Sequence, residues 1–179
     1  MTLDRKLILY ISMSLDGYIA DSNDDLNFLS MVEKKGEDYG YANFTKTIDT
    51  VIIGRRSYDK VISMGFEYPH SDKDVYIITR TVKPSIGNFT YYSGSLKELI
   101  LTLKRKKGKN IYCDGGAEIV NELFKDNLID EIIISIIPIM LGDGVSLFKD
   151  GRPELKLRLI DTKQFEKGLV QLHYTRIDV

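Results

Sequence analysis

The sequence predicts an α/β fold: a mixed, mostly parallel central sheet flanked by helices, with an antiparallel ribbon at the C-terminus. Short apolar runs alternate with helical patterns along residues 7–137, which is typical of parallel strands joined by helices. The run Ile132–Ile137 is apolar on both alternating faces, as in a strand covered on both sides. Beyond residue 155, apolar and charged residues alternate, as in half-buried antiparallel strands.

The first half of the chain begins with a strand. Leu7–Ile11 is a short apolar run, and the polar segment 14–25 that follows predicts a loop. Apolar side chains at helical spacing over residues 41–48 predict a helix. Val51–Ile53 predicts the next strand, and we expect a short helix after it through residues 58–62.

The middle of the chain continues the alternation. Val75–Ile78 predicts a strand, and the apolar positions within 96–103 lie on one face of an amphipathic helix. Gly108 is placed to end this helix. Ile111–Cys113 predicts a further strand, and the apolar pattern over residues 118–124 predicts the helix that follows it.

The pattern of apolar and charged residues changes in the C-terminal segment. Pro138 stops the long apolar strand. Leucines alternate with charged residues over 155–159, and apolar residues alternate again over 170–174. With a turn near Lys167-Gly168, these segments predict two half-buried strands of an antiparallel ribbon.

Composition bounds the whole chain. It has 179 residues with 43% hydrophobic content, enough for a single domain over residues 1–179 with its own core. The net charge of −1 indicates no general attraction to nucleic acid or to an anionic membrane. The basic cluster at 104–109 is interpreted as a solvated helix end. The start of the chain is charged, and its apolar run over 7–11 is too short for a signal peptide or a membrane span.

Cys113 is the only cysteine, which excludes an intramolecular disulfide and a cysteine-based zinc site. We interpret it as a buried small residue. The two histidines, His70 and His173, stand alone, so we expect no metal site. Together these features predict a cytoplasmic protein.

Two glycine-marked junctions carry the functional hypothesis. Gly115 and Gly116 stand between a predicted strand and a predicted helix, where the absence of Cβ lets the backbone approach a ligand closely. The start of that helix offers unpaired N–H groups to a phosphate or diphosphate. A second junction, at Gly54, is followed by Arg55 and Arg56. Each could be a tight turn alone, but the pair favours a nucleotide cofactor.

Five segments, in this order, resemble the dihydrofolate reductase-like superfamily. They are S-L-D-G-Y-I-A (14–20), I-I-G-R-R-S-Y (52–58), D-G-G (114–116), I-D-E (129–131) and P-I-M-L-G-D-G-V-S-L-F (138–148). The resemblance is closest to the branch grouped with the C-terminal reductase domain of bifunctional riboflavin-biosynthesis proteins. It implies a three-layer dihydrofolate reductase-like fold, and NADPH as the donor of a hydride to a pterin-like or ribosylaminopyrimidine substrate.

The resemblance also implies where the cofactor would lie. Gly115 and Gly116 would approach its diphosphate through a cis peptide bond, and Thr79 with Arg80 would meet the adenosine 2′-phosphate, because a guanidinium pairs well with phosphate oxygens. Ile19 and Ala20 would lie against the nicotinamide. The remaining expected cofactor contacts are Gly54, Arg55, Arg56, Ser57, Asp114, Ala117 and Glu118. If Arg55 and Arg56 open a helix, at least one of them is expected to be solvated or cap-bound.

The resemblance places the substrate between the 16–20 loop, Asp25 and Phe28. Asp25 matches the active-site carboxylate of dihydrofolate reductases, although it could equally be a helix N-cap. Asp16, in a strong turn dipeptide with Gly17, is a second catalytic candidate. Many relatives carry an acidic residue where this chain has Asn27, so the position that carries the chemistry stays open.

Alternatives stay open for the activity. The chain starts at the reductase's first strand, so we expect no deaminase domain, and the arginine-rich substrate-phosphate segment of the riboflavin reductases is not found. The substrate could therefore be dihydrofolate, another pterin or a ribosylaminouracil. A non-catalytic NADPH-binding or sensing protein is the rival hypothesis. The resemblance further implies a homodimer, for which the C-terminal strands offer a surface.

Overall fold

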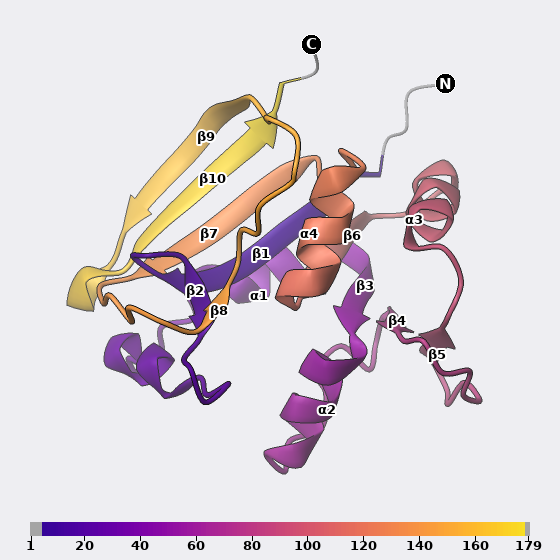
Figure 1. Cartoon of the computed structure of the whole chain (residues 1–179), viewed down its shortest axis with the longest axis horizontal. Helices are drawn as coiled ribbons and strands as arrows, with labels where there is room; N and C mark the ends of the chain where they lie inside the picture. The colour runs from indigo at the N-terminus through magenta and orange to yellow at the C-terminus, as the bar shows by residue number, and fades with distance from the viewer. Residues whose placement is uncertain (1–4, 178–179) are drawn as a thin grey trace.

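The computed structural model describes residues 5–177 and shows an eight-stranded mixed sheet with helices on both faces (Figure 1). Its strands follow the order β5-β4-β3-β6-β1-β7-β10-β9, and a separate small sheet pairs β2 with β8. The strands are β1 (Leu7–Ser14), β2 (Tyr18–Ala20), β3 (Ile48–Gly54), β4 (Asp74–Ile78), β5 (Phe89–Tyr92), β6 (Asn110–Gly115), β7 (Glu131–Ile137), β8 (Val145–Ser146), β9 (Leu157–Gln164) and β10 (Val170–Arg176).

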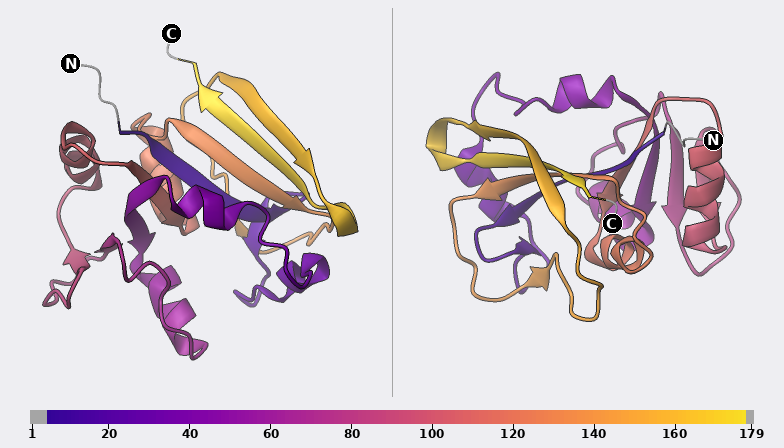
Figure 2. Two further views of the ribbon diagram at one scale, coloured as in Figure 1. Left: turned by 180° about the vertical axis from the view of Figure 1, so that it is seen from behind. Right: turned by 90° about the horizontal axis from the view of Figure 1, so that it is seen from above.

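Neighbouring strands from β5 to β7 are parallel, whereas β10 is antiparallel to both β7 and β9. The helices are η1 (Asn27–Val32), α1 (Tyr41–Thr45), α2 (Arg55–Ser63), α3 (Leu96–Arg105), α4 (Ala117–Lys125) and η2 (Glu166–Gly168). Figure 2 shows α1 and α4 on opposite faces of the sheet. The α/β class and the C-terminal antiparallel ribbon are therefore confirmed.

Successive side chains of the inner strands point to opposite faces of the sheet, so the core has one layer on each face. In β1, Leu7 and Leu9 pack with α3 and α4, while Ile8 packs with Phe44 of α1 on the other face. Both layers are apolar because the strand is covered on both sides. The same is true of β7, whose residues are almost all buried, as its continuous apolar run predicts.

Short or exposed elements differ from the prediction. The helix over 41–48 ends at Thr45, because Ile48 already starts β3 and is buried in the core. The loop predicted over 14–25 contains the three-residue strand β2. β5 was not predicted from the sequence. All four of its residues are half-buried, so it shows no alternation of buried and exposed positions that would indicate a strand.

Two predicted positions need correction. α3 ends at Arg105, before Gly108, and a Cβ on Gly108 would lie 2.5 Å from Asp49 Oδ2, so this glycine serves close packing. Lys104 is not part of a solvated helix end. It is buried, and its Nζ lies 2.5 Å from Asp130 Oδ2 and donates to the Leu128 carbonyl at 2.8 Å.

The C-terminal ribbon turns at η2, close to the predicted Lys167-Gly168. β10 is partly buried against β7, but β9 is exposed along its whole length. The expectation of two half-buried strands is thus wrong for β9, because it is the edge strand of the sheet and its side chains are exposed at every position. Within residues 5–177, no helix is long and apolar enough to cross a membrane. Residues 1–4 and 178–179 of the predicted 1–179 domain lie outside the described residues.

Candidate functional site

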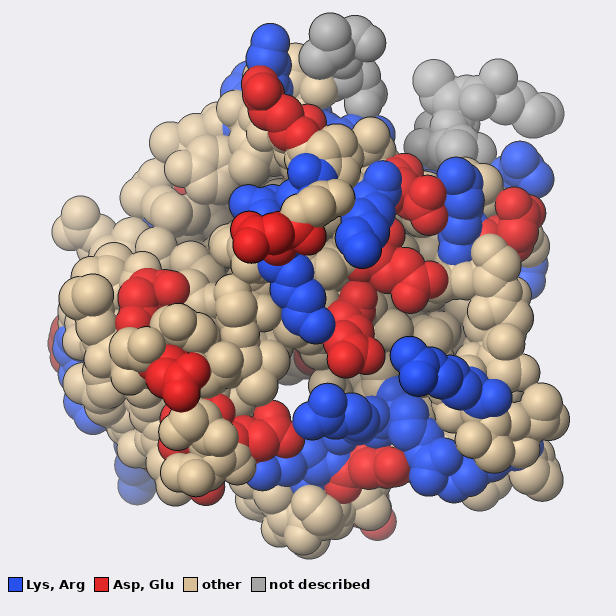
Figure 3. Space-filling view, viewed as in Figure 1, with Lys and Arg blue, Asp and Glu red and all other residues tan. Residues whose placement is uncertain are grey.

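A cavity of about 1310 Å³ crosses the carboxyl ends of the parallel strands. Its lining follows the sheet order from β4 through β3, β6 and β1 to β7. The molecule is hollowed on the face shown in Figure 3, where acidic and basic side chains both border the hollow. Ligands of open α/β sheets bind outside the carboxyl ends of the strands. The volume exceeds the roughly 300–1,000 Å³ that is typical of a pocket for one small ligand.

Two helices begin in one half of this cavity, α2 directly after Gly54 and α4 directly after Gly116. The peptide bond between Gly115 and Gly116 is cis. A Cβ on Gly116 would lie 2.7 Å from Ser57 Oγ, and one on Gly54 would lie 3.0 Å from Ile119 Cγ1. The glycines therefore let the two helix starts approach each other, which brings two sets of unpaired N–H groups to one wall.

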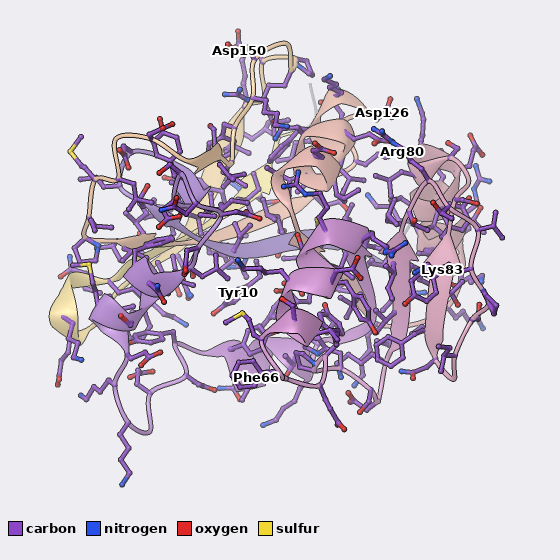
Figure 4. All side chains as sticks on the ribbon, turned by 60° about the horizontal axis from the view of Figure 1, so that its bottom comes forward. Tyr10, Phe66, Arg80, Lys83, Asp126 and Asp150 are labelled. Carbon is purple, nitrogen blue, oxygen red and sulfur yellow. The ribbon has the colours of Figure 1, made fainter. Side chains whose placement is uncertain are left out.

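Basic side chains border this half. The Nε of Arg55 donates to Asp59 at 2.9 Å, along the helix, while the Arg56 side chain is 81% exposed. The two arginines thus do not converge on one point, as expected for neighbours that open a helix. Arg80 follows β4 and also lines the cavity. Figure 4 shows Arg80 and Tyr10 on opposite sides of α2, so the cavity reaches both sides of that helix.

Nearly all of the cofactor contacts expected from sequence line this one cavity. Gly115 is the exception among them, because it stands one residue behind the wall formed by Gly116. The lining residues of this set are Ile19, Ala20, Gly54, Arg55, Arg56, Ser57, Thr79, Arg80, Asp114, Gly116, Ala117 and Glu118.

The other half of the cavity has a floor of tyrosines around one carboxylate. The Tyr112 hydroxyl donates to Asp114 Oδ1 at 2.6 Å, and the Tyr68 hydroxyl donates to Oδ2. Beside them, the Tyr41 hydroxyl lies 2.8 Å from His70 Nε2. Burial raises the pKa of Tyr41, Tyr68 and Tyr112, and it lowers the pKa of His70. At neutral pH the phenols therefore stay protonated and the imidazole is neutral.

Apolar side chains wall this second half. Leu29 and Val32 come from η1, Ile137 from the end of β7, and Leu169 from the turn after η2. Tyr10, from β1, adds an aromatic ring. A planar ring fits such walls, while the carboxylate of the floor supplies a hydrogen-bond acceptor.

Asp25 and Phe28 do not take the positions expected for substrate contacts. Among residues 5–177, neither belongs to the cavity lining. Asp25 Oδ1 accepts the Asn27 backbone N–H at 2.9 Å in a local turn before η1, whose N-cap residue is Leu26 and has no side-chain cap hydrogen bond. Phe28 is buried in a small core cluster with Val32 and Ile137. The structure thus places Asp25 neither in the cavity lining nor at the N-cap of η1.

Asp16 ties two loops together and likewise lies outside the lining. Its carboxylate accepts the Ser14 hydroxyl at 2.5 Å and the backbone N–H groups of Leu141 and Gly142 at 3.1 and 2.7 Å. These bonds, that of Ser14 first, lower the pKa of Asp16. Asp16 thus holds the L-G-D-G loop beside the 16–20 loop, where Gly144 approaches the Ala20 carbonyl too closely for any Cβ.

The sequence argument missed Tyr112 and the hydrogen bonds that Tyr68 and Tyr112 donate to Asp114. Tyr112 and Asp114 are two residues apart in one strand, so their side chains leave the same face of the sheet. That spacing would have found the pair. Tyr68 and His70 come from an irregular segment between α2 and β4, and nothing in their spacing indicates that they meet Asp114. Cys113, on the opposite face, is buried, which raises the pKa of its thiol to about 12.

Comparisons with known proteins agree with this geometry. A sequence model of the RibD C-terminal domain matches residues 5–171. The chain is 42% identical over 175 residues to the uncharacterized protein YwjB of Bacillus subtilis, covering 97% of this chain and 99% of YwjB. A putative riboflavin biosynthesis protein from Shewanella sp. PV-4 has a crystal structure with a TM-score of 0.87 at 30% identity, covering 97% of this chain and 99% of that one.

A more distant neighbour shares the fold. Dihydrofolate reductase from Enterococcus faecalis, solved in complex with NADP(H), has a TM-score of 0.66 at 18% identity and covers 97% of each chain. At this identity the likeness concerns the fold alone. With the match over residues 5–171, the chain belongs to the RibD C-terminal domain family, a reductase-like family with a dihydrofolate reductase-like fold.

Proposed function

We propose that this protein is a cytoplasmic NADPH-dependent reductase that acts on a heterocyclic substrate. One observation carries the proposal: a single cavity joins a half built from two helix starts to a half built from tyrosines around Asp114. A dinucleotide and a planar substrate would thus meet over β6 and β1. Membership of a reductase-like family supports the same chemistry.

The residues of the first half fit a dinucleotide phosphate. The starts of α2 and α4 offer backbone N–H groups to a diphosphate, next to Gly54 and Gly116. Arg80, with Thr79 beside it, would hold a 2′-phosphate through its guanidinium. Glu118, in the first turn of α4, suits a ribose hydroxyl, since an ionised carboxylate only accepts hydrogen bonds. When bound, NADPH supplies the hydride.

The second half would hold and polarise the substrate. Asp114 would face the reacting edge of the ring, where it can accept hydrogen bonds from ring N–H groups or pass on a proton. The apolar walls from Leu29, Ile137 and Leu169 would exclude water from this region. In such a setting the electrostatic contribution of a fixed carboxylate is larger than in water.

A pterin-like ring and a ribosylaminopyrimidine are both candidate substrates. The Shewanella relative is titled a putative riboflavin biosynthesis protein, which favours the pyrimidine, and the E. faecalis neighbour is a dihydrofolate reductase. Turnover of a phosphoribosylaminouracil would select the first class, and turnover of a dihydropterin the second. Each assay follows the oxidation of NADPH by absorbance.

Thermal unfolding with NADPH, with NADH and without ligand tests the cofactor assignment directly. A ligand at 100 times its dissociation constant stabilises the folded protein by about 2.7 kcal/mol. We expect a clear rise in Tm with NADPH and a smaller rise with NADH. No rise with either ligand, in a protein that unfolds cooperatively, contradicts the proposal. A rise without turnover of any substrate would favour an NADPH-sensing protein instead.

A further inference from the structure

Tyr68 lies behind the cavity floor and is one of the most buried polar side chains near it. It belongs to the segment between α2 and β4, and only 5% of its surface is exposed. Its hydroxyl donates to Oδ2 of Asp114, yet its side chain does not line the cavity. Tyr68 can therefore act on a ligand only through Asp114.

The carboxylate of Asp114 is held at both oxygens. Tyr68 donates to Oδ2, while Tyr112 donates to Oδ1 at 2.6 Å. Two fixed donors restrict rotation of the carboxylate, because each of its oxygens has a hydrogen-bond partner from a different part of the chain. Burial raises the pKa of both phenols, so both remain donors throughout the neutral range.

The Tyr68 ring cannot easily move away. It packs edge-on against His70, with ring centroids 5.8 Å apart, and against Tyr58 at 5.4 Å. The other titratable groups around Asp114 come from different elements: Tyr41 from α1, His70 from the same segment as Tyr68, and Cys113 from β6 itself.

We propose that Tyr68 is a positioning residue, which fixes the orientation of the Asp114 carboxylate toward the substrate. This inference rests on the proposed function, because it takes Asp114 to face the substrate. Removal of the Tyr68 hydroxyl leaves Oδ2 without that donor. The carboxyl group then turns more freely.

Tyr68→Phe tests the proposal, because it removes one oxygen and keeps the buried ring. We expect kcat at neutral pH to fall about tenfold, since one charge-assisted hydrogen bond is worth about 1.5 kcal/mol or more. The KM for NADPH is expected to stay unchanged, because Tyr68 does not reach the first half of the cavity. Tyr76→Phe is the matched control, since Tyr76 packs in β4 without contact to Asp114.

A readout without turnover separates this inference from the proposed function. The carboxyl carbons of ¹³C-labelled aspartates can be observed by NMR at a fixed neutral pH, with Asp114 assigned through Asp114→Asn. The chemical shift of the Asp114 carboxyl carbon should change in Tyr68→Phe, which removes its hydrogen bond, and stay in place in Tyr76→Phe. An unchanged shift in folded Tyr68→Phe overturns the inference. A changed shift in a protein that turns over no substrate supports the contact between Tyr68 and Asp114 and contradicts only the proposed reductase.

Discussion

Arg80 stands where a single side chain can distinguish two cofactors. It follows β4 at the edge of the cavity, exposed and without a carboxylate within ion-pair distance among the described residues. A guanidinium there gains energy only when a phosphate arrives. Its assignment to the 2′-phosphate comes from the family resemblance and stays a prediction.

Arg80→Ala should weaken NADPH binding about 10- to 100-fold and change NADH binding little, because a hydrogen bond to a charged group contributes about 1.5–3 kcal/mol. Calorimetric titration of the variant with each cofactor measures both affinities. Arg105→Ala, which removes an exposed arginine at the end of α3, serves as the control. Equal losses for NADPH and NADH would remove the 2′-phosphate contact from the proposal.

Asp25 and Asp114 show what sequence reasoning can and cannot establish about a carboxylate. Resemblance indicated that a carboxylate belongs in the site, and several carboxylates line the cavity, Asp114 among them. Which of them faces a ligand depends on where the side chains point, and the Asp25 carboxylate binds the nearby N–H of Asn27. The Tyr68 hydroxyl that donates to Asp114 comes from a distant part of the chain, so no local pattern reveals it.

Asp25→Ala should therefore behave as the loss of one local hydrogen bond before η1. We expect the free energy of unfolding to fall by roughly 0.5–1.5 kcal/mol and the affinity for NADPH to stay unchanged. Chemical denaturation and cofactor titration measure the two effects. Asp25→Asn, which keeps the acceptor oxygen, should restore most of the stability. A large loss of kcat in stable Asp25→Asn would return this residue to the list of catalytic candidates.

Buried elements were predicted well, and exposed ones poorly. β7 is apolar along its length because it is packed on both faces of the sheet. α4 shows an apolar stripe because one side of the helix packs on the core. β9 is exposed at every position, so its leucines do not mark a buried face. β2 and β8 are too short for any period to show, and they exist because their pairing joins two loops.

Glu131 joins three strands through charge. From β7 it accepts from Lys6 Nζ at 2.6 Å, next to β1, and lies 2.9 Å from His173 Nε2 in β10. The hydrogen bond with His173 and then that with Lys6 lower the pKa of Glu131 from 4.5 to about 2. Because the folded-state pKa is depressed, the stabilisation is complete above about pH 4.5 and is lost as the pH falls toward 2.

Glu131→Gln should consequently lower the free energy of unfolding by about 1–3 kcal/mol at neutral pH. The difference from the wild type should shrink as the pH is lowered from about 4.5 toward 2. Urea denaturation across this range measures it. Glu154→Gln, at an exposed glutamate, should show little difference at any pH. A difference that does not depend on pH would mean that packing, not charge, accounts for the effect.

At the scale of the whole molecule, the sheet ends in an unprotected strand. β9 pairs with β10 on one edge only, and its apolar side chains Leu159 and Ile160 are 51% and 48% exposed. A free strand edge offers unpaired N–H and C=O groups to another strand. A two-fold antiparallel pairing centred on Thr162 would set Asp161 of one copy opposite Lys163 of the other, twice. We propose that two copies of the chain pair through β9.

The double substitution Leu159→Lys/Ile160→Lys should convert such a dimer to a monomer, because it places four like charges along one two-fold contact. Sedimentation velocity over a range of concentrations measures the change in mass. Val82→Lys/Ile86→Lys alters two residues that are still more exposed and lie in the loop between β4 and β5, so it should leave the dimer intact. A wild type that sediments as a monomer at every concentration would contradict the pairing. A double variant that stays dimeric would place the contact on another face. The cavity is lined by residues of one chain, so we expect NADPH to bind to the monomer and to the dimer alike.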